Sequence, residues 1–343
     1  MVDTSLSEDL PFRVLRSTWQ PVALSRDLPL NGIRPYRLLD EEIVVARFPG
    51  GLLAAHAACP HKGARLDAGA IRGGELRCAY HGWRFDVAGA CTNIPSFLSP
   101  VPDKQAQARL TTYGVRERYG MVWVKLDGEE RSPLPDVPEF ENGAWTYLVA
   151  EPLVFRAGFR REIENYLDMT HFAFAHSTTL GAAADPVVPA MRIAEHPDGF
   201  QMDAPFPALA SPEAPPGKLQ QAHRRRQCCF LPNFTTIRQS FADGDERVLV
   251  HIPSPNGLYE CTVFWALAIS PGFKGPPPEE QLAFAVNVLN EDRRMCENQI
   301  PREVPINPAK GGWGVLVTPG DTLANTFQRT FRKYLSARVH KSL

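Results

Sequence analysis

Two short segments of the sequence each combine one cysteine with one histidine. Cys59-Pro60-His61 is followed, after sixteen intervening residues, by Cys78-Ala79-Tyr80-His81. The segments therefore have the forms Cys-x-His and Cys-x-x-His. A [2Fe–2S] cluster in which two thiolates hold one iron and two imidazoles hold the other needs one cysteine and one histidine from each of two loops. The two segments predict such a cluster.

Structural zinc is the main alternative, because it also accepts two cysteines and two histidines. Zinc fingers usually place both cysteines in one arm and both histidines in the other, and the mixed arms of this sequence differ from that pattern. A chance pairing of buried cysteines with surface histidines is the third interpretation. The spacing, with Pro60 beside one arm and Gly82-Trp83 after the other, favours the Rieske-type cluster.

A second pair of histidines lies in a segment that predicts a helix. Residues from Arg160 to about Ala175 lack proline and glycine and have helix-like apolar spacing. His171 and His176 would be separated by about 140° of rotation and ~7.5 Å of rise on an ideal helix. If both bind one metal, the helix must bulge or end between them. Two histidines and one carboxylate with open positions favour Fe(II) for oxygen chemistry, although a helix that merely carries two histidines is the simpler reading of this segment alone.

The two segments together resemble a known family. The strings CPHKGARL, from Cys59, and CAYHGWRFD, from Cys78, are similar to the cluster motif of the Rieske non-haem iron oxygenases. The iron motif of the same family, Asn-x-x-Asp-x-x-His-x-x-x-x-His, is matched in family order farther along the chain. The resemblance extends from about Thr18 to Arg302. It implies a cluster and a mononuclear Fe(II), with the matching residues Cys59, His61, Cys78, His81, Asn165, Asp168, His171 and His176.

The third iron ligand is implied by the resemblance to be a carboxylate on a late helix. Residues Glu279 to Gln299, opened by a proline run, predict such a helix. Asp292 is the expected ligand, and Glu291 is the alternative.

The resemblance also implies how electrons reach the iron. In the family the two centres of one chain are too far apart, and an aspartate bridges a cluster histidine of one subunit to an iron histidine of the next in a head-to-tail trimer. Here this implies a homotrimer in which Asp168 lies between His81 and His171, with Asn165 near the open iron position. No GxGxxG or GxxxxGK motif is present. A separate NAD(P)H-dependent reductase, with or without a ferredoxin, must therefore supply the electrons.

The short chain resembles the single-subunit, homotrimeric oxygenases, many of which are monooxygenases or demethylases. We therefore expect hydroxylation or O- or N-demethylation of a small aromatic substrate by O2. Ring cis-dihydroxylation is one alternative, and an electron-transfer protein without catalysis, with about two irons per chain instead of about three, is another. Expected pocket residues are Phe230, Asn233, Ile237, His251, Trp265 and Val286. The run Arg224–Arg226 could hold a carboxylate, although a solvated strand end explains it more simply.

The elements that position these residues predict an α+β chain of two domains. Short β-rich runs such as Glu42–Phe48 and Gly120–Leu126, with turns at Gly50-Gly51 and Gly73-Gly74, indicate an all-β domain over residues 1–128. A charged, proline-rich linker begins at 129. Strands over Thr235–Phe241, Arg247–Ile252 and Tyr259–Ile269 predict an antiparallel sheet, flanked by helices, in a second domain over 129–343.

Composition sets the remaining bounds. The chain has 343 residues, with 37 basic and 38 acidic side chains, so its net charge of −1 argues against a broadly basic nucleic-acid binder. Seven cysteines are too few for a disulfide framework. Neither a secretory signal nor an apolar stretch of about 18 residues is visible, so we expect a cytoplasmic protein without a membrane span.

Overall fold

The computed structural model describes residues 10–96, 107–128, 133–177, 179, 187–205, 222–241, 243–306 and 316–339. The chain divides into two compact units. The first unit is Leu15–Leu134, and the second combines Pro135–Leu343 with the N-terminal residues up to Val14. A short helix, α1 (Leu10–Leu15), spans the first boundary. The second unit therefore contains a few residues from the start of the chain, which were expected to belong to the first domain.

The first unit consists of antiparallel strands, as its alternating sequence predicts. One sheet has the order β1-β10-β9-β4-β3-β2, and a smaller one has the order β5-β6-β7-β8. Their bounds are β1 Gln20–Leu24, β2 Ile33–Leu38, β3 Glu41–Phe48, β4 Gly51–His56, β5 Ala70–Arg72, β6 Glu75–Arg77, β7 Arg84–Phe85, β8 Cys91–Asn93, β9 Thr112–Arg118 and β10 Met121–Lys125. Gly73 and Gly74 join β5 to β6 with φ of 61° and 79°. These positive values suit the two-residue turns that match the twist of a hairpin.

A buried apolar cluster runs through the smaller sheet of the first unit and the adjoining strands. It contains Leu66, Leu76 and Phe85, and it also contains Cys59 and Cys78. The two cysteines therefore lie at the edge of a packed core, and the loops that carry them are anchored by it.

The second unit is built on a larger antiparallel sheet with the order β11-β18-β17-β16-β15-β14-β13, in which β12 also pairs with β18. The bounds are β11 Thr146–Val149, β12 Leu153–Phe155, β13 Arg192–His196, β14 Gly199–Pro205, β15 Ala222–Phe230, β16 Phe234–Phe241, β17 Glu246–Gly257 and β18 Glu260–Ile269. The three strands expected from the sequence correspond to β16, β17 and β18.

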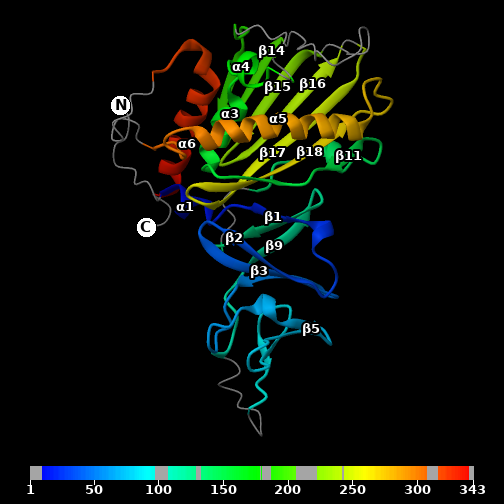
Figure 1. Ribbon diagram of the computed structural model, residues 1–343, viewed down its shortest axis with the longest axis vertical. Coiled ribbons are helices and arrows are strands. Elements are labelled where there is room, and N and C mark those ends of the chain that lie inside the picture. Colours follow the sequence, from blue (N-terminus) through cyan, green and yellow to red (C-terminus); the bar gives the residue numbers. More distant parts are fainter. Residues whose placement is uncertain are drawn as a thin grey trace. The chain divides into compact units, whose positions relative to one another are not determined.

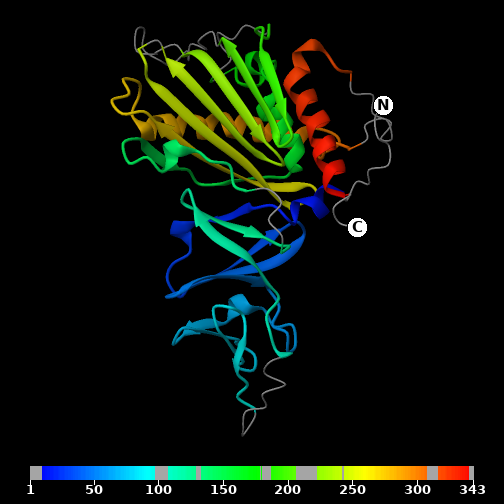
Figure 2. The same ribbon diagram turned by 180° about the vertical axis from the view of Figure 1, so that it is seen from behind.

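Helices cover one face of this sheet. They are α3 (Phe159–Leu167), α4 (Phe172–Ala175), α5 (Pro278–Asn298) and α6 (Thr322–Val339). Helix α5 lies in front of the sheet in Figure 1, and the sheet lies in front of α5 in the opposite view of Figure 2. Helix α5 matches the expected helix Glu279–Gln299. Helix α6 has no counterpart among the sequence expectations, and it packs on α3 and β14 with Phe327 and Phe331 buried.

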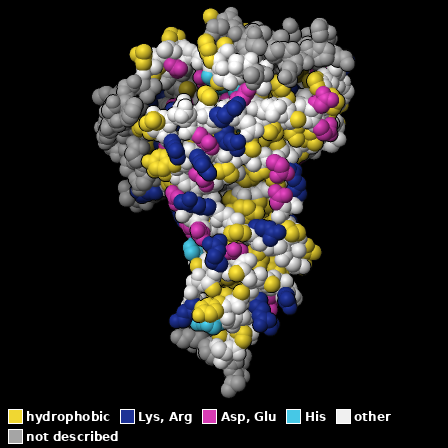
Figure 3. All heavy atoms as spheres, in the orientation of Figure 1, with side chains coloured by type: hydrophobic (Ala, Val, Ile, Leu, Met, Phe, Trp, Pro, Cys, Tyr) yellow, Lys and Arg dark blue, Asp and Glu magenta, His cyan; other side chains and the backbone are white. Residues whose placement is uncertain are grey.

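The surface carries both signs of charge. On the face shown in Figure 3, basic and acidic side chains are interspersed over the helices of the second unit, in keeping with the net charge of −1. None of the helices among the described residues combines the length and the apolar character of a membrane span.

Candidate metal centres

The two loops that carry Cys59 and Cys78 fold in the same way. In each loop the N–H of the cysteine donates to the carbonyl of the fifth residue after it, at 2.8 Å in the first loop and 2.9 Å in the second. The N–H of the glycine four residues after the cysteine donates back to the cysteine carbonyl, at 2.9 and 3.0 Å. Those glycines, Gly63 and Gly82, both have φ of 70°, a left-handed conformation that glycine adopts without a steric penalty. Two equivalent turns therefore present the four expected cluster ligands.

The side chains of these loops converge. Cys59 and Cys78 are buried, and burial raises the pKa of the Cys59 thiol to about 11, with the neighbouring Cys78 adding to the rise. The rings of His61 and His81 lie 4.5 Å apart, and His61 stacks on Trp83 at the same separation. The Nδ1 atom of His61 is buried and has no hydrogen-bond partner. Two buried thiols and an orphaned imidazole nitrogen are the donors that a Rieske [2Fe–2S] cluster uses, so the residues fit the group.

The helix expected over residues 160–175 is interrupted and forms two helices. Helix α3 ends at Leu167, and Asp168 is extended with φ −77° and ψ 134°. The short helix α4 follows, with His171 directly before it and His176 directly after it, where the backbone leaves the helical region at φ −103° and ψ 31°. The helix therefore breaks before His171 and again at His176. Because α4 ends at Ala175, the helix ends between the two histidines, as expected if both bind one metal.

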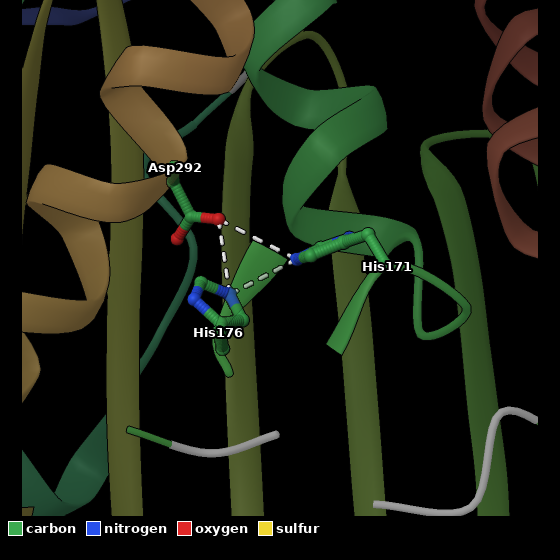
Figure 4. A group of neighbouring side chains, drawn as sticks. All are labelled: His171, His176 and Asp292. Carbon is green, nitrogen blue, oxygen red and sulfur yellow. Dashed lines mark hydrogen bonds and ion pairs between the residues drawn. The ribbon is translucent and has the colours of Figure 1, made fainter. Parts of the chain in front are cut away.

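His171, His176 and Asp292 meet between α4 and α5, and Figure 4 shows their side chains pointing toward one another. The two Nε2 atoms lie 3.0 Å apart. Asp292 Oδ1 lies 3.4 Å from Nε2 of His171 and 3.2 Å from Nε2 of His176. Ligands about 2.1 Å from one metal at right angles would be about 3 Å apart. The spacing and the donor types therefore fit the two-histidine, one-carboxylate site of non-haem Fe(II).

Neighbouring side chains hold this triad in place. Glu291, the alternative ligand, does not join it: its Oε2 lies 2.8 Å from Nδ1 of His176 and accepts from Oγ1 of Thr179 at 2.5 Å. Asn165 donates from Nδ2 to Oδ1 of Asp292 at 2.7 Å. A carboxylate on the far nitrogen of a ligating histidine fixes the tautomer and the ring orientation.

Asp168 contacts the other histidine. Its Oδ1 accepts from the backbone N–H of Thr170 at 2.7 Å and from Oγ1 of Thr170 at 2.6 Å. Its Oδ2 lies 3.3 Å from Nδ1 of His171, and the Asp168 side chain is 27% exposed. Burial lowers the pKa of His171, but Asp168 and Asp292 outweigh it and raise that pKa to about 9. The cluster of carboxylates thus favours positive charge at the point where a metal cation would sit.

Three of the expected pocket residues lie on the helix-covered face of the sheet. His251 pairs with Trp265 on β18 across the strands, and its Nε2 makes a close buried contact with Oε1 of Glu162 on α3. Ile237 is buried on the same face, two residues along β16 from the partner of His251. Trp265 packs with Val286 of α5 in an apolar cluster, so these two belong to the core beneath that helix.

The other two expected pocket residues are placed differently. Phe230 follows Cys229, which is fully buried, and successive strand residues point to opposite faces. Phe230 therefore faces away from the helices, where it packs edge-on against Phe234. Asn233 lies in the turn after β15 and donates to the carbonyl of Pro253 at 2.8 Å.

Sequence reasoning missed Glu162. The ring of Tyr166, one turn later on α3, stacks on His251 at 3.9 Å and 15°. Burial raises the pKa of Glu162, and His251 partly offsets the rise. Glu162 occupies a position of α3 at which the helical spacing predicts an apolar side chain, and this could have drawn attention to it. Its partner His251 is 89 residues away in the sequence, so no local pattern shows the pair.

Two family models match the chain. The Rieske [2Fe–2S] domain matches residues 18–109, and the vanillate O-demethylase oxygenase C-terminal domain matches residues 155–339. The second match covers more than half of the chain. The chain is a Rieske terminal oxygenase. Two relatives that match this chain over more than four fifths of their own length are named as demethylases.

The methylxanthine N3-demethylase NdmB of Pseudomonas putida is 31% identical over 310 residues, which cover 84% of this Rieske oxygenase and 83% of that protein. The methylxanthine N1-demethylase NdmA of the same organism is 29% identical over 85% of this chain and 83% of its own length. A solved structure of NdmB superposes with a TM-score of 0.78 at 26% identity and covers 95% of this chain and 93% of that chain.

Proposed function

We propose that this Rieske oxygenase uses O2 and externally supplied electrons to hydroxylate or demethylate a methyl-bearing aromatic substrate. The observation that carries the proposal is the triad of His171, His176 and Asp292, whose donor atoms have the mutual spacing of ligands to one metal. His171 and His176 flank α4, and Asp292 lies on α5. Three protein donors would leave further positions of the iron for O2 and substrate. The demethylase activities named for the full-length relatives support the same reaction class.

The reaction R–H + O2 + 2 e⁻ + 2 H⁺ → R–OH + H2O requires electrons and a protected site. When bound, the iron supplies the site of O2 reduction and the cluster supplies electrons one at a time. The protein residues orient the donors. Glu291 accepts a hydrogen bond from the Nδ1–H group of His176, so Nε2 of His176 stays available to the metal. Asn165 donates a hydrogen bond to Asp292 and fixes its orientation. Demethylation is the same hydroxylation on an O- or N-methyl group, followed by loss of formaldehyde.

The electron source is proposed to be a separate NAD(P)H-dependent reductase, with or without a ferredoxin. The oxidoreductase NdmD of Pseudomonas putida shares 37% identity over 118 residues, which are 34% of this chain and 20% of NdmD. This match supports a partner from the same kind of system. None of the seven cysteines forms a disulfide, which supports work in the reducing cytoplasm.

We also propose a homotrimer in which electrons pass between subunits. His81 is exposed on the first unit, and Asp168 is partly exposed beside His171 on the second. Both groups are thus accessible from outside their own unit, as a bridge from the cluster of one subunit to the iron of the next requires. We further propose that the functional boundary between the two domains lies in the linker that begins at 129.

The decisive experiment reconstitutes the protein anaerobically with iron and sulfide and supplies reductase and NADH. About three irons and two acid-labile sulfides per chain are expected, because the two centres need that number. A panel of methoxy-, N-methyl- and methyl-substituted aromatics should then give formaldehyde or a hydroxylated methyl group. A cis-diol product would replace the monooxygenase proposal with ring dihydroxylation. Two irons per chain without any turnover would indicate an electron-transfer protein.

A further inference from the structure

The run of three arginines on β15 places its side chains on two faces of the sheet. Arg225 is only 4% exposed, and its guanidinium carbon lies 6.0 Å from the ring centre of Phe172 on α4, so it faces the helices. Successive strand residues alternate between faces. Arg224 and Arg226 therefore face away from the helices, and their side chains are 55% and 41% exposed. The expectation of a solvated strand end holds for these outer two arginines, and they are also the two that a carboxylate can reach from solvent.

Neighbouring strands add charged side chains to the outer face of the sheet, which is the face turned away from the helices. Asp203 on β14 pairs with Arg226 on β15 and with Arg192 on β13 across the strands. Directly opposite residues of an antiparallel pair share a face, so these three residues form a row. Arg224 lies two residues from Arg226 and joins them. This is the sheet face that lies in front of α5 in Figure 2.

A single carboxylate in this row faces several guanidinium groups. Oδ1 of Asp203 lies 2.9 Å from Nη2 of Arg224 and 3.1 Å from Nε of Arg226, and Nε2 of Gln201 donates to its Oδ2 at 2.7 Å. Burial raises the pKa of Asp203, but the hydrogen bonds from these neighbours outweigh it and lower that pKa, so Asp203 is an anion at neutral pH. Arg192 is exposed and makes no ion pair with the residues that the structure describes. The row therefore carries excess positive charge.

An open cavity of about 530 Å³ lies beside these charges, at the edge strands of the sheet. Arg192, Arg224 and Asp203 line it. The remaining wall is apolar and includes Met191 and Pro205. Ligand sites commonly combine an apolar wall with a few polar groups that converge on one point. This cavity has both features, and its polar groups are mainly cationic.

We propose that this cavity binds a small organic carboxylate, that is, an apolar ring or chain with one carboxylate group. Arg192 and Arg224 bind the carboxylate, because a planar guanidinium matches it through two parallel hydrogen bonds. The apolar wall beside Met191 contacts the body of the ligand. The ion pair of Asp203 with Arg224 is partly exposed and therefore weak, so an incoming carboxylate replaces it at little cost.

The cavity is separate from the iron site. His171 and His176 flank α4, one of the helices that cover the inner face of the sheet, whereas Arg192, Asp203 and Arg224 lie on the outer face. A carboxylate bound here is therefore not the reacting substrate, and its binding requires neither iron nor electrons. The inference goes beyond the proposed function and does not depend on it.

Titration calorimetry with the iron-loaded protein, in the absence of reductase, tests the site with matched acids and amides. Benzoate and hexanoate should bind, and benzamide and hexanamide should not. Arg192→Met and Arg224→Met should each weaken binding of the acids by about tenfold, the value of one hydrogen bond to a charged group. Arg329→Met is the control for lost positive charge, because Arg329 lies on α6 and pairs with Glu195. It should leave the Kd of the acids unchanged.

Asp203→Asn should have the opposite effect. It removes the carboxylate that competes for Arg224 and keeps an oxygen that accepts from Gln201. The acids should therefore bind about twofold to fivefold more tightly, as expected for one exposed charge interaction. A variant that only distorts the sheet would not bind the acids more tightly, so this result decides even if an arginine variant fails to fold.

Several results would overturn the proposal. Neither acid binds at millimolar concentration, or acid and amide bind with the same Kd. Acid binding that is unchanged in both arginine variants, or that disappears when iron is removed, would place the ligand elsewhere. Inorganic phosphate that displaces benzoate at equal concentration would show that the apolar wall contributes nothing, and the class of ligand would be wrong.

Discussion

Replacing Asp168 with asparagine would exchange the carboxylate oxygen that faces His171, a proposed iron ligand, for an amide NH2 group. Oδ1 of Asp168 accepts two hydrogen bonds from Thr170, at 2.7 and 2.6 Å, so the amide oxygen of the substituted side chain would take that place. The new NH2 group would then face Nδ1 of His171, where Oδ2 now lies at 3.3 Å. Because Nδ1 carries the proton when Nε2 binds a metal, a donor would meet a donor.

The size of the effect separates two roles of Asp168. Loss of a carboxylate that only orients a ligating histidine lowers metal affinity or activity by about 10–100-fold. Iron at a concentration well above the weakened Kd restores occupancy. If Asp168 also connects the cluster of one subunit to the iron of the next, turnover should fall by far more than about 100-fold while iron and cluster both remain bound.

The assay combines metal content with the rate at which O2 and substrate reoxidise the reduced cluster, followed by its visible absorbance. Asp168→Asn should retain about three irons per chain and reoxidise its cluster extremely slowly. Thr170→Val is the control, because it removes the Oγ1 donor and leaves the carboxylate and the backbone N–H. Reoxidation at the wild-type rate in Asp168→Asn would refute the electron route, and failure to hold iron at saturation would make Asp168 a structural residue.

Three further predictions follow from the geometry of the two units. Glu291→Gln keeps an acceptor for Nδ1 of His176 but loses its charge, so Fe(II) affinity should fall about tenfold in an anaerobic titration, whereas unchanged affinity would show that Glu291 does not support the ligand. Gly82→Ala places a side chain at φ 70°, which should cost about 1–2 kcal/mol and accelerate loss of cluster absorbance on heating relative to wild type. Arg160→Met leaves Glu303, now 3.1 Å from Nε of Arg160, buried without its cation. This should cost about 3–5 kcal/mol by urea unfolding, and the double change Arg160→Met with Glu303→Leu should recover most of the loss.

The donor residues of the two cluster loops could be predicted from the sequence because the residues that form each loop are neighbours along the chain. Each loop contains its own cysteine, histidine and turn glycine within six residues, and the backbone hydrogen bonds that shape it also lie within those residues. The convergence of His171 and His176 could be expected for the same reason, because both histidines belong to one local motif. The helix expected over 160–175 had to bulge or end between the histidines if both bind one metal, and α4 does end at Ala175. The interruption after Leu167 was not predicted, because helix propensity alone does not place it.

Long-range choices could not be predicted in this way. Glu291 and Asp292 are adjacent, and adjacent helix residues point about 100° apart. Which of them reaches both histidines depends on how α5 rotates against α4, and that rotation is set by the packing of α5 on Trp265 and its neighbours. The partnership of Glu162 with His251 likewise joins a helix to a distant strand.

The sequence by itself determined which cysteine, histidine and carboxylate side chains this oxygenase offers as metal donors, and in what order. The spacing of donors within one short loop follows directly from the order of residues along the chain. Only the tertiary structure decided which carboxylate completes the triad, which of three arginines turns inward, and that Phe230 turns away. The physical reason is the same in each case. A strand or helix fixes the relative directions of its own side chains, but the packing of sheet against helices decides which direction is the inside.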